Sequence, residues 1–441
     1  MCALFCFTFL CGGILYAQEP DIVTKSIIVA ESLIDQQKPD EAVTILLEAF
    51  PLAQNKEDKT QIEFLLGMAS MLKEDYATAE WVFRRILKNS PGLTRVRLEL
   101  ALLYFKTGKD EKADYHFRLV NGSKDLPQEV KDKIGFFLYQ IRYRKKWDYY
   151  LNLGIAPSSN VNNAAGQRYE CIYFWGIPLC RELETKKSSI GLSGSAGLEY
   201  YQRLSPNLRW KSTLSGTVSD FSGSQYDVHS VGFATGPMYN YRRGSAALYA
   251  SGSRIWYGGK GMLYDYGPLL QLNYDIAPRA SLWLNTSFKF TDYDRKGYDY
   301  MNGTDTFVMP SLFYAISSKT YIMLKPSASF IRTEESFSNK EIYRIGLGIG
   351  TELPLGISLY VEPSYSNSRA KGEGTFVEDY TFVYKRRRDE NYGIEARILS
   401  RQINIFGFTP TLNYSYVKTK SNVYSGNYDK HVVEMGITNR F

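Results

Sequence analysis

Few residues in this 441-residue chain could support catalysis or metal binding. The three histidines, His116, His229 and His431, are widely separated, and no HExxH sequence, paired CxxC motif or acidic calcium loop accompanies them. The string GGKG at 258–261 lacks the upstream glycine and the Ser or Thr that a phosphate-binding loop needs, and GLSGS at 191–195 is not GxSxG. The sequence therefore predicts neither an enzyme nor a metal or cofactor site.

Thiol chemistry is the remaining possibility. Residues 1–17, MCALFCFTFLCGGILYA, are apolar and end at Ala17 before the polar QEPD, the pattern of a secretory signal peptide cleaved after Ala17. A mature chain cut there retains two cysteines, Cys171 and Cys180, in a compartment that permits oxidation. We therefore expect Cys171 and Cys180 to form a disulfide.

Composition narrows the class of protein further. The 53 basic residues are nearly matched by 46 acidic ones and are spread along the chain, so the net charge of +7 gives no nucleic-acid footprint. Aromatic residues make up 15% of the chain, with 35 Tyr beside 35 Gly. This combination favours a β-barrel of the outer membrane.

The first third of the chain reads as helical repeats. From about Ser26 to Arg144, apolar residues recur at intervals of three and four. Self-comparison gives a period of 34 between two copies and a third copy 37 residues earlier, which is the tetratricopeptide spacing. The residues expected to pack within and between the repeats are Ala42, Leu66, Gly67, Ala79, Phe83, Leu100, Tyr104, Ala113 and Phe117.

The repeats depart from the usual pattern in two places. Glu63 and Arg97 stand where a tetratricopeptide repeat usually has an early aromatic residue. A further amphipathic segment, Gln128 to Arg144, is expected to cap the stack. The alternative to a peptide-binding surface is a helical spacer that binds nothing.

From Trp147 onward the apolar period changes to two, as in β-strands. Six short turn signals, one of them at Ser400-Arg401, alternate strictly with seven longer polar links, one of them around 258–262. This predicts fourteen antiparallel strands with both ends on the short-turn side, including one strand that begins near Phe406. In hydrocarbon only a closed barrel leaves no unpaired strand edge. The terminal Phe441 and the alternation before it fit the signal that the barrel-assembly machinery reads.

Six prolines lie inside these strand-like segments, although proline cannot donate to a ladder hydrogen bond. All six fall in the apolar parity class, so we expect them to face lipid, with β-bulges at several. They are Pro237, Pro268, Pro310, Pro326, Pro363 and Pro410.

The segment WDYYLNLGIAPSSNVNNA at 147–164, with Asn160, Asn162 and Asn163, follows the helical repeats and precedes strands that end in GITNRF. This arrangement resembles the surface lipoprotein assembly modulator (Slam) family over the whole mature chain. The resemblance implies an outer-membrane translocon that moves client lipoproteins, or secreted haem-scavenging proteins in some relatives, to the cell surface.

We therefore expect a signal peptide at 1–17, a periplasmic tetratricopeptide-like α-solenoid at 18–145 and a monomeric 14-stranded transmembrane β-barrel at 146–441. The expected partners are client proteins, the barrel-assembly machinery, periplasmic chaperones and outer-membrane lipids, with no nucleic acid. The alternative function is a passive or polysaccharide-export porin. A lumen crowded with long charged side chains and no dependence of any client on the protein would favour that alternative.

Overall fold

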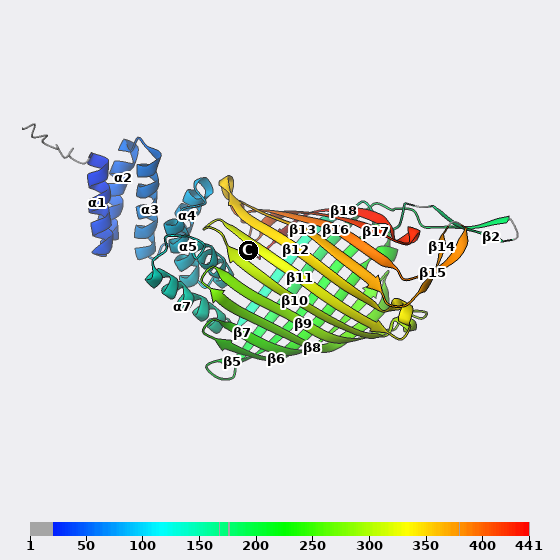
Figure 1. Ribbon diagram of the computed structural model, residues 1–441. Helices are drawn as coiled ribbons and strands as arrows, with labels where there is room; N and C mark the ends of the chain where they lie inside the picture. The colour runs from blue at the N-terminus through cyan, green and yellow to red at the C-terminus, as the bar shows by residue number, and fades with distance from the viewer. Residues whose placement is uncertain (1–20, 167, 175–176, 379, 441) are drawn as a thin grey trace, which may run out of the picture. The chain divides into compact units, whose positions relative to one another are not determined.

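A computed structural model describes residues 21–440 apart from 167, 175–176 and 379. Helices are followed by a closed antiparallel barrel of fourteen strands (Figure 1), so the predicted fold class is confirmed. The chain divides between Val82 and Phe83 into two compact units. The expected signal peptide and Phe441 lie outside the described residues.

Within the described residues, seven α-helices precede the barrel. None of the helices in the described ranges is long and apolar enough to cross a membrane. Their bounds are α1 Ile22–Asp35, α2 Pro39–Ala49, α3 Lys56–Leu72, α4 Tyr76–Asn89, α5 Thr94–Lys106, α6 Asp110–Val120 and α7 Gln128–Arg144.

The first six helices form three pairs that share one internal position. Ala42, Ala79 and Ala113 each occupy the fourth position of the second helix of their pair, and each is fully buried. A methyl group at this position lets neighbouring helices approach closely, because a larger side chain would hold the helices apart. The regular spacing of these alanines in the sequence thus corresponds to equivalent positions in α2, α4 and α6.

The turn inside each pair also repeats. Gln37, Glu74 and Gly108 each lie two residues before the second helix and have φ of 61°, 60° and 73°. Only the third is a glycine, the residue that reaches this left-handed region without steric cost. The two other turns are therefore held by the packing of the helices that they join.

The barrel strands run in the order β1-β18-β17-β16-β13-β12-β11-β10-β9-β8-β7-β6-β5-β4, so β1 lies between the last strand and β4. Their bounds are β1 Trp147–Ser158, β4 Ser189–Arg203, β5 Leu208–Phe221, β6 Val228–Tyr241, β7 Gly244–Tyr257, β8 Lys260–Ala277, β9 Ala280–Tyr293, β10 Gly303–Ala315, β11 Thr320–Thr333, β12 Lys340–Leu353, β13 Ile357–Ala370, β16 Arg388–Ser400, β17 Thr409–Ser421 and β18 Tyr428–Thr438.

Two long links contain small hairpins of their own, and short 3₁₀ helices occupy other connections. The hairpins are β2 Tyr169–Phe174 with β3 Ile177–Glu182, and β14 Gly374–Glu378 with β15 Thr381–Lys385. The 3₁₀ helices are η1 Phe50–Leu52, η2 Ser224–Tyr226, η3 Asp299–Met301, η4 Ser336–Ser338, η5 Pro354–Gly356 and η6 Tyr424–Gly426.

Strand β12 shows how the two faces of the barrel differ. Ile345, Leu347 and Ile349 are exposed on the outside, while the glycines between them face the lumen. A Cβ atom on Gly348 would lie 2.1 Å from the hydroxyl oxygen of Tyr360 on the neighbouring strand. The small inner residues of β12 therefore make room for a large polar side chain across the wall.

Two predicted connections are wrong. The sequence places a short turn at Ser400-Arg401 and a strand beginning near Phe406, whereas residues 401–408 form the link and β17 begins at Thr409. Phe406 has φ of 51° and is 98% exposed, so its backbone turns where an extended strand was expected. Alternation of apolar residues does not distinguish such a turn from the start of a strand. The expected long link at 258–262 is instead a tight turn between β7 and β8.

The six prolines all share the parity of the outward apolar residues, and Pro237, Pro268 and Pro363 are themselves exposed. The expected bulges at these prolines are wrong. Where ladder pairs are interrupted, as beside Pro237 and Pro268, the register continues unchanged, and the register shifts lie instead at Ile255/Trp256 and Asp275/Ala277. Losing one donor breaks one hydrogen bond but does not require an extra residue in the strand.

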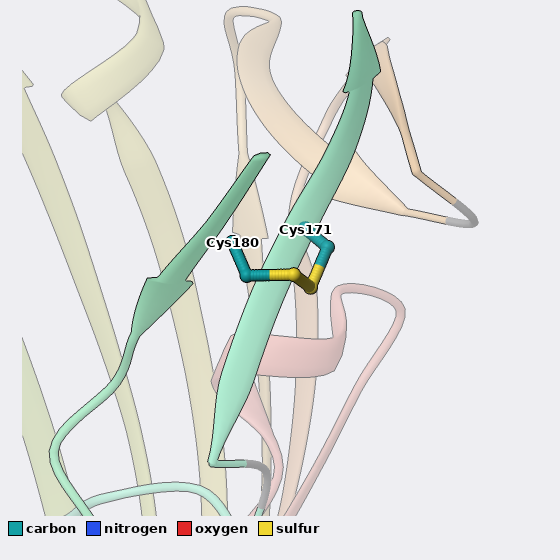
Figure 2. The surroundings of a disulfide bond; sticks show 2 residues. All are labelled: Cys171 and Cys180. Atoms are coloured by element: carbon teal, nitrogen blue, oxygen red, sulfur yellow. A yellow bond between two sulfur atoms is a disulfide. The ribbon is translucent and has the colours of Figure 1, made fainter. Parts of the chain in front are cut away.

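Cys171 and Cys180 face each other across the β2–β3 hairpin and form a disulfide (Figure 2). The backbone N–H of Tyr173 donates to the carbonyl oxygen of Tyr380 at 3.0 Å, which ties this hairpin to the β14–β15 link. The disulfide therefore stiffens one of two hairpins that lie side by side in the long connections.

Candidate functional site

The lumen carries polar and charged side chains that bond to one another across strands. Lys325 Nζ lies 2.6 Å from a carboxylate oxygen of Glu362 and 2.8 Å from the hydroxyl of Tyr360. A second pair, Lys289 and Asp265, lies 2.9 Å apart. Because these opposite charges are paired, the lumen offers a polar surface without a block of one sign.

The end of the barrel with the short connections is joined to the helices α5 to α7, which belong to the same compact unit (Figure 1). At the centre of this junction Arg97 of α5 is fully buried and forms an ion pair with Glu352 at the end of β12. Arg97 also donates to the carbonyl oxygen of Pro91 at 2.6 Å and lies 3.1 Å from Nδ1 of His116. We call this junction the rim cluster.

Other groups complete the bonding of Glu352 in the rim cluster. The hydroxyl of Tyr115 on α6 donates to Glu352 at 3.1 Å, and Nε of Arg401 lies 3.4 Å from the same carboxylate. The guanidinium of Arg401 also stacks over the ring of Tyr115 at 4.2 Å. A buried carboxylate needs this many partners, because a charge without them is strongly unfavourable in a buried site.

Electrostatics keep His116 neutral in this cluster. Burial lowers its pKa, and the neighbouring positive charge of Arg97 lowers it further, so the pKa lies well below 6.5. The ring of His116 stacks on Tyr104 with centroids 5.6 Å apart. The rim cluster is thus built for an uncharged imidazole.

A second ionic group lies where α6 and α7 meet the β8–β9 connection. Arg118 lies 2.7 Å from Asp114 and 3.1 Å from Asp275, and it donates to Ser281 Oγ at 2.7 Å. Arg142 of α7 reaches the other oxygen of Asp275 at 3.1 Å. Asp275 therefore joins two helices to one barrel connection.

The remaining short connections are also contacted by the helices. Ser318 Oγ donates to the carbonyl oxygen of Gly92 at 2.9 Å, Arg279 donates to that of Ser123 at 2.5 Å, and Arg142 donates to that of Arg242 at 3.0 Å. A weak bond of 3.4 Å joins Tyr139 to Asn207, and Arg440 after β18 lies 3.8 Å from Glu111. Helices α5 to α7 therefore bond to the rim around its circumference.

The predicted repeat residues lie in the helical interior. Apart from half-buried Leu66, all of those residues are buried. Phe117 stacks on Phe137 of α7 with centroids 5.3 Å apart, so the segment expected to cap the repeats does pack on them. Of these residues, Leu100 and Tyr104 lie close to the rim cluster, because both line a cavity with His116 and Glu352, and Tyr104 also stacks on His116.

Sequence reasoning missed the residues that join the two parts of the chain. Their one signal was Arg97 in the place of an aromatic residue, and the structure explains it, because that position faces Glu352 instead of another repeat. Within the described ranges no group of His, Cys, Asp and Glu residues could hold a metal ion. These residues therefore attach the helices to the barrel and give the lumen a polar lining.

A model of the family described as surface lipoprotein assembly modifier matches residues 147–441. The chain belongs to this family. A surface lipoprotein assembly modifier of Pasteurella multocida is 23% identical, covering 96% of this chain and 84% of that protein. The hemophilin secretion modulator of Acinetobacter baumannii is 20% identical, covering 96% and 86%.

Among solved structures, a FadL homologue of Pseudomonas aeruginosa matches with a TM-score of 0.39 and 8% identity, covering 67% of this chain and 91% of that one. Membership of the surface lipoprotein assembly modifier family and the closed barrel place the protein in the outer membrane. Helices α5 to α7, which belong to the barrel unit, lie on the periplasmic side, where the short connections are found.

Proposed function

We propose that this protein is a translocon that moves client surface lipoproteins, or secreted proteins, from the periplasm to the cell surface. The observation that carries the proposal is a barrel with a polar lumen whose periplasmic rim is bonded to helical repeats around its circumference. A client bound by helices α5 to α7 would already be at the entrance of the barrel. The names of the relatives, assembly modifier and secretion modulator, agree with such a role.

The helical pairs supply the recognition surface in this proposal. Their period and the recurring buried alanines support a tetratricopeptide-like stack, whose concave face typically binds peptides. The sequence contains no phosphate-binding loop, so the driving force is assigned to folding of the client outside the cell or to its delivery by a periplasmic chaperone. We assign Phe441 to recognition by the barrel-assembly machinery and propose that the barrel acts as a monomer.

Deletion of residues 21–140, with the signal peptide kept, tests this function. We expect the barrel to remain a heat-modifiable outer-membrane protein while clients stay in the periplasm. The measurement is protease accessibility of a co-expressed surface lipoprotein on intact cells, at equal barrel abundance. Unchanged display would remove the repeats from the mechanism, and a client that is displayed equally well without any barrel would favour the porin alternative.

A further inference from the structure

The boundary between the first and last barrel strands, β1 and β18, differs from the other boundaries of the barrel. We call it the seam. The β1–β18 ladder runs only from Asn152 to Ser158, opposite Thr438 to Val432, although β1 pairs with β4 from Trp147 to Ser158. Within the described chain, the first five residues of β1 have no ladder partner in β18. The seam is therefore held by fewer backbone bonds than the other side of the same strand.

The composition of the seam weakens it further. Pro157 has no backbone N–H to donate, and the β1–β18 ladder is interrupted at Ala156 and Pro157. Gly154 is opposite Gly436, so this pair adds no side-chain contact across the strands. A Cβ on Gly436 would lie 2.3 Å from the carbonyl oxygen of Leu153, so β1 and β18 approach closely at this pair.

At the extracellular end, where the ladder stops at Ser158, one further backbone bond and polar side chains continue the contact between the two strands. Ser159 donates its N–H to the carbonyl oxygen of His431 at 2.9 Å, and its hydroxyl oxygen accepts from the N–H of His431 at 2.9 Å. The fully buried Asn160 donates to the carbonyl oxygen of Asp429 at 3.0 Å and accepts from the N–H of Ala164 at 2.9 Å. We call this group the outer latch, and it contains the first asparagine of the SSNVNN segment.

A second group does the same at the periplasmic end. The side chain of Asn439 accepts from the N–H of Leu151 at 2.8 Å and donates to the carbonyl oxygen of Tyr149 at 3.3 Å, as a further strand residue would. Arg440 lies 3.4 Å from Asp148 and stacks over the ring of Tyr150 at 4.7 Å. This group, the inner latch, holds the part of β1 that β18 does not reach.

The lumen side of the seam is hollow and polar. A cavity of about 300 Å³ is lined by Asn152, Arg397 and Glu434, and also by Leu153 and Ile437 of the outward face. The cavity therefore extends to the part of the barrel wall that β1 and β18 form. Side-chain bonds of this kind can be exchanged for bonds to water or to a client in the lumen, whereas a continuous ladder in hydrocarbon has no such substitute.

We propose that the seam between β1 and β18 opens laterally and lets the acyl anchor of a client lipoprotein pass from the lumen into the bilayer. The inference rests on the proposed translocon function. An acyl chain is unfavourable in a polar lumen and favourable in lipid, while the polypeptide has the opposite preference. If the barrel wall opens at the seam, the acyl chain can enter the lipid while the polypeptide stays in the polar lumen.

A pair of cysteines across the seam tests the proposal. Ile155 and Met435 are register partners on the exposed outer face, so Ile155→Cys with Met435→Cys can lock the seam by oxidation. The matched control is Leu412→Cys with Met435→Cys, which locks β17 to β18 with one cysteine in common. The probe is an epitope-tagged surface lipoprotein of the host whose display is lost when this protein is deleted.

We expect oxidation to abolish display of the probe in the seam variant, reduction to restore it, and the control to display the probe in both states. When the seam is locked, a version of the probe without its lipidated cysteine should still leave the periplasm, and it should be found in the medium because it has no acyl anchor. Equal display by the oxidised seam and control variants would overturn the proposal. The proposed function fails separately, if no lipoprotein and no secreted protein of the host depends on the unmodified protein for display or secretion.

The outer and inner latches can also be tested by a measurement that needs no client protein. Asn160→Ala with Asn439→Ala removes both side-chain bridges and should lower the temperature at which the folded barrel loses its shifted gel mobility. The control is Asn285→Ala on an interior strand. An unchanged transition in the latch variant, relative to this control, would show that the seam is not held by these residues.

Discussion

Arg97 shows how one residue can belong to two structures at once. Arg97 lies in α5, a helix that follows the repeat pattern. Its guanidinium, however, pairs with Glu352 of the barrel and not with a residue of another repeat. Both side chains are buried, with Arg97 fully enclosed and 8% of the Glu352 side chain exposed. Removing one member of such a pair is costly, because the other charge is left buried without its partner.

Glu352→Gln should therefore loosen the helices from the rim. Loss of a buried partner typically costs about 3–5 kcal/mol, and we expect a loss of this order for the docked state. The measurement is the rate at which added protease cuts α5 and α6 in purified outer membranes. Glu362→Gln is the control, because it removes a lumen carboxylate bonded to Lys325 and should leave that rate unchanged.

The disulfide makes a prediction at the same scale. We expect quantitative thiol labelling of the denatured, unreduced mature protein to find no free cysteine, because Cys171 and Cys180 are joined. Replacing both cysteines by serine should destabilise the closed hairpin by about 2–3 kcal/mol in the chain-entropy account. Two labelled cysteines in the unreduced protein would contradict the pairing.

At the scale of elements, α6 meets the barrel through a neutral imidazole that faces Arg97, Arg401, Glu352 and Lys112. The pKa of His116 lies below 6.5 while α6 is docked on the barrel and rises toward 6.5 when α6 separates from it. The undocked state therefore binds protons more readily than the docked state. The contribution of His116 to docking is therefore present above pH 6.5 and is lost as the pH falls from there toward the folded pKa.

We expect amide protons of α5 and α6 to be less protected from hydrogen exchange at pH 5.5 than at pH 7.5, after correction for intrinsic rates. About 1.4 kcal/mol per unit of pH is the largest slope that one group can give. His116→Phe keeps a ring against Tyr104 and cannot titrate, so it should remove this dependence. The same slope in both proteins would assign the effect to other groups.

The elements were predicted to different degrees, for physical reasons. Alternation gave the fourteen strands, because one face of each meets lipid and the other a polar lumen. It failed at Phe406, where an apolar side chain stands on an exposed turn. It could not show the rim cluster, because Arg97 and Glu352 are 255 residues apart and their contact exists only once the barrel is closed.

At the scale of the whole barrel unit, helices bonded around the periplasmic rim should restrict passage through the lumen. Deleting residues 83–144 should make intact cells sensitive to vancomycin, which the closed outer membrane excludes. Deletion of residues 21–82, which form the other compact unit, is the control and should leave cells resistant. Equal resistance of both strains would show that the barrel is closed by something other than these helices.

Because the rim cluster joins the helices to the barrel, residues of these two parts of the chain should evolve in a correlated way. The family match begins at residue 147, so it contains Glu352 but not Arg97. If the ion pair is maintained, substitutions at the two positions should be correlated among relatives, and a relative with a neutral residue in place of Glu352 should lack the arginine. Exchange of helical segments between family members would then succeed only where the incoming helices carry side chains that suit the recipient's rim.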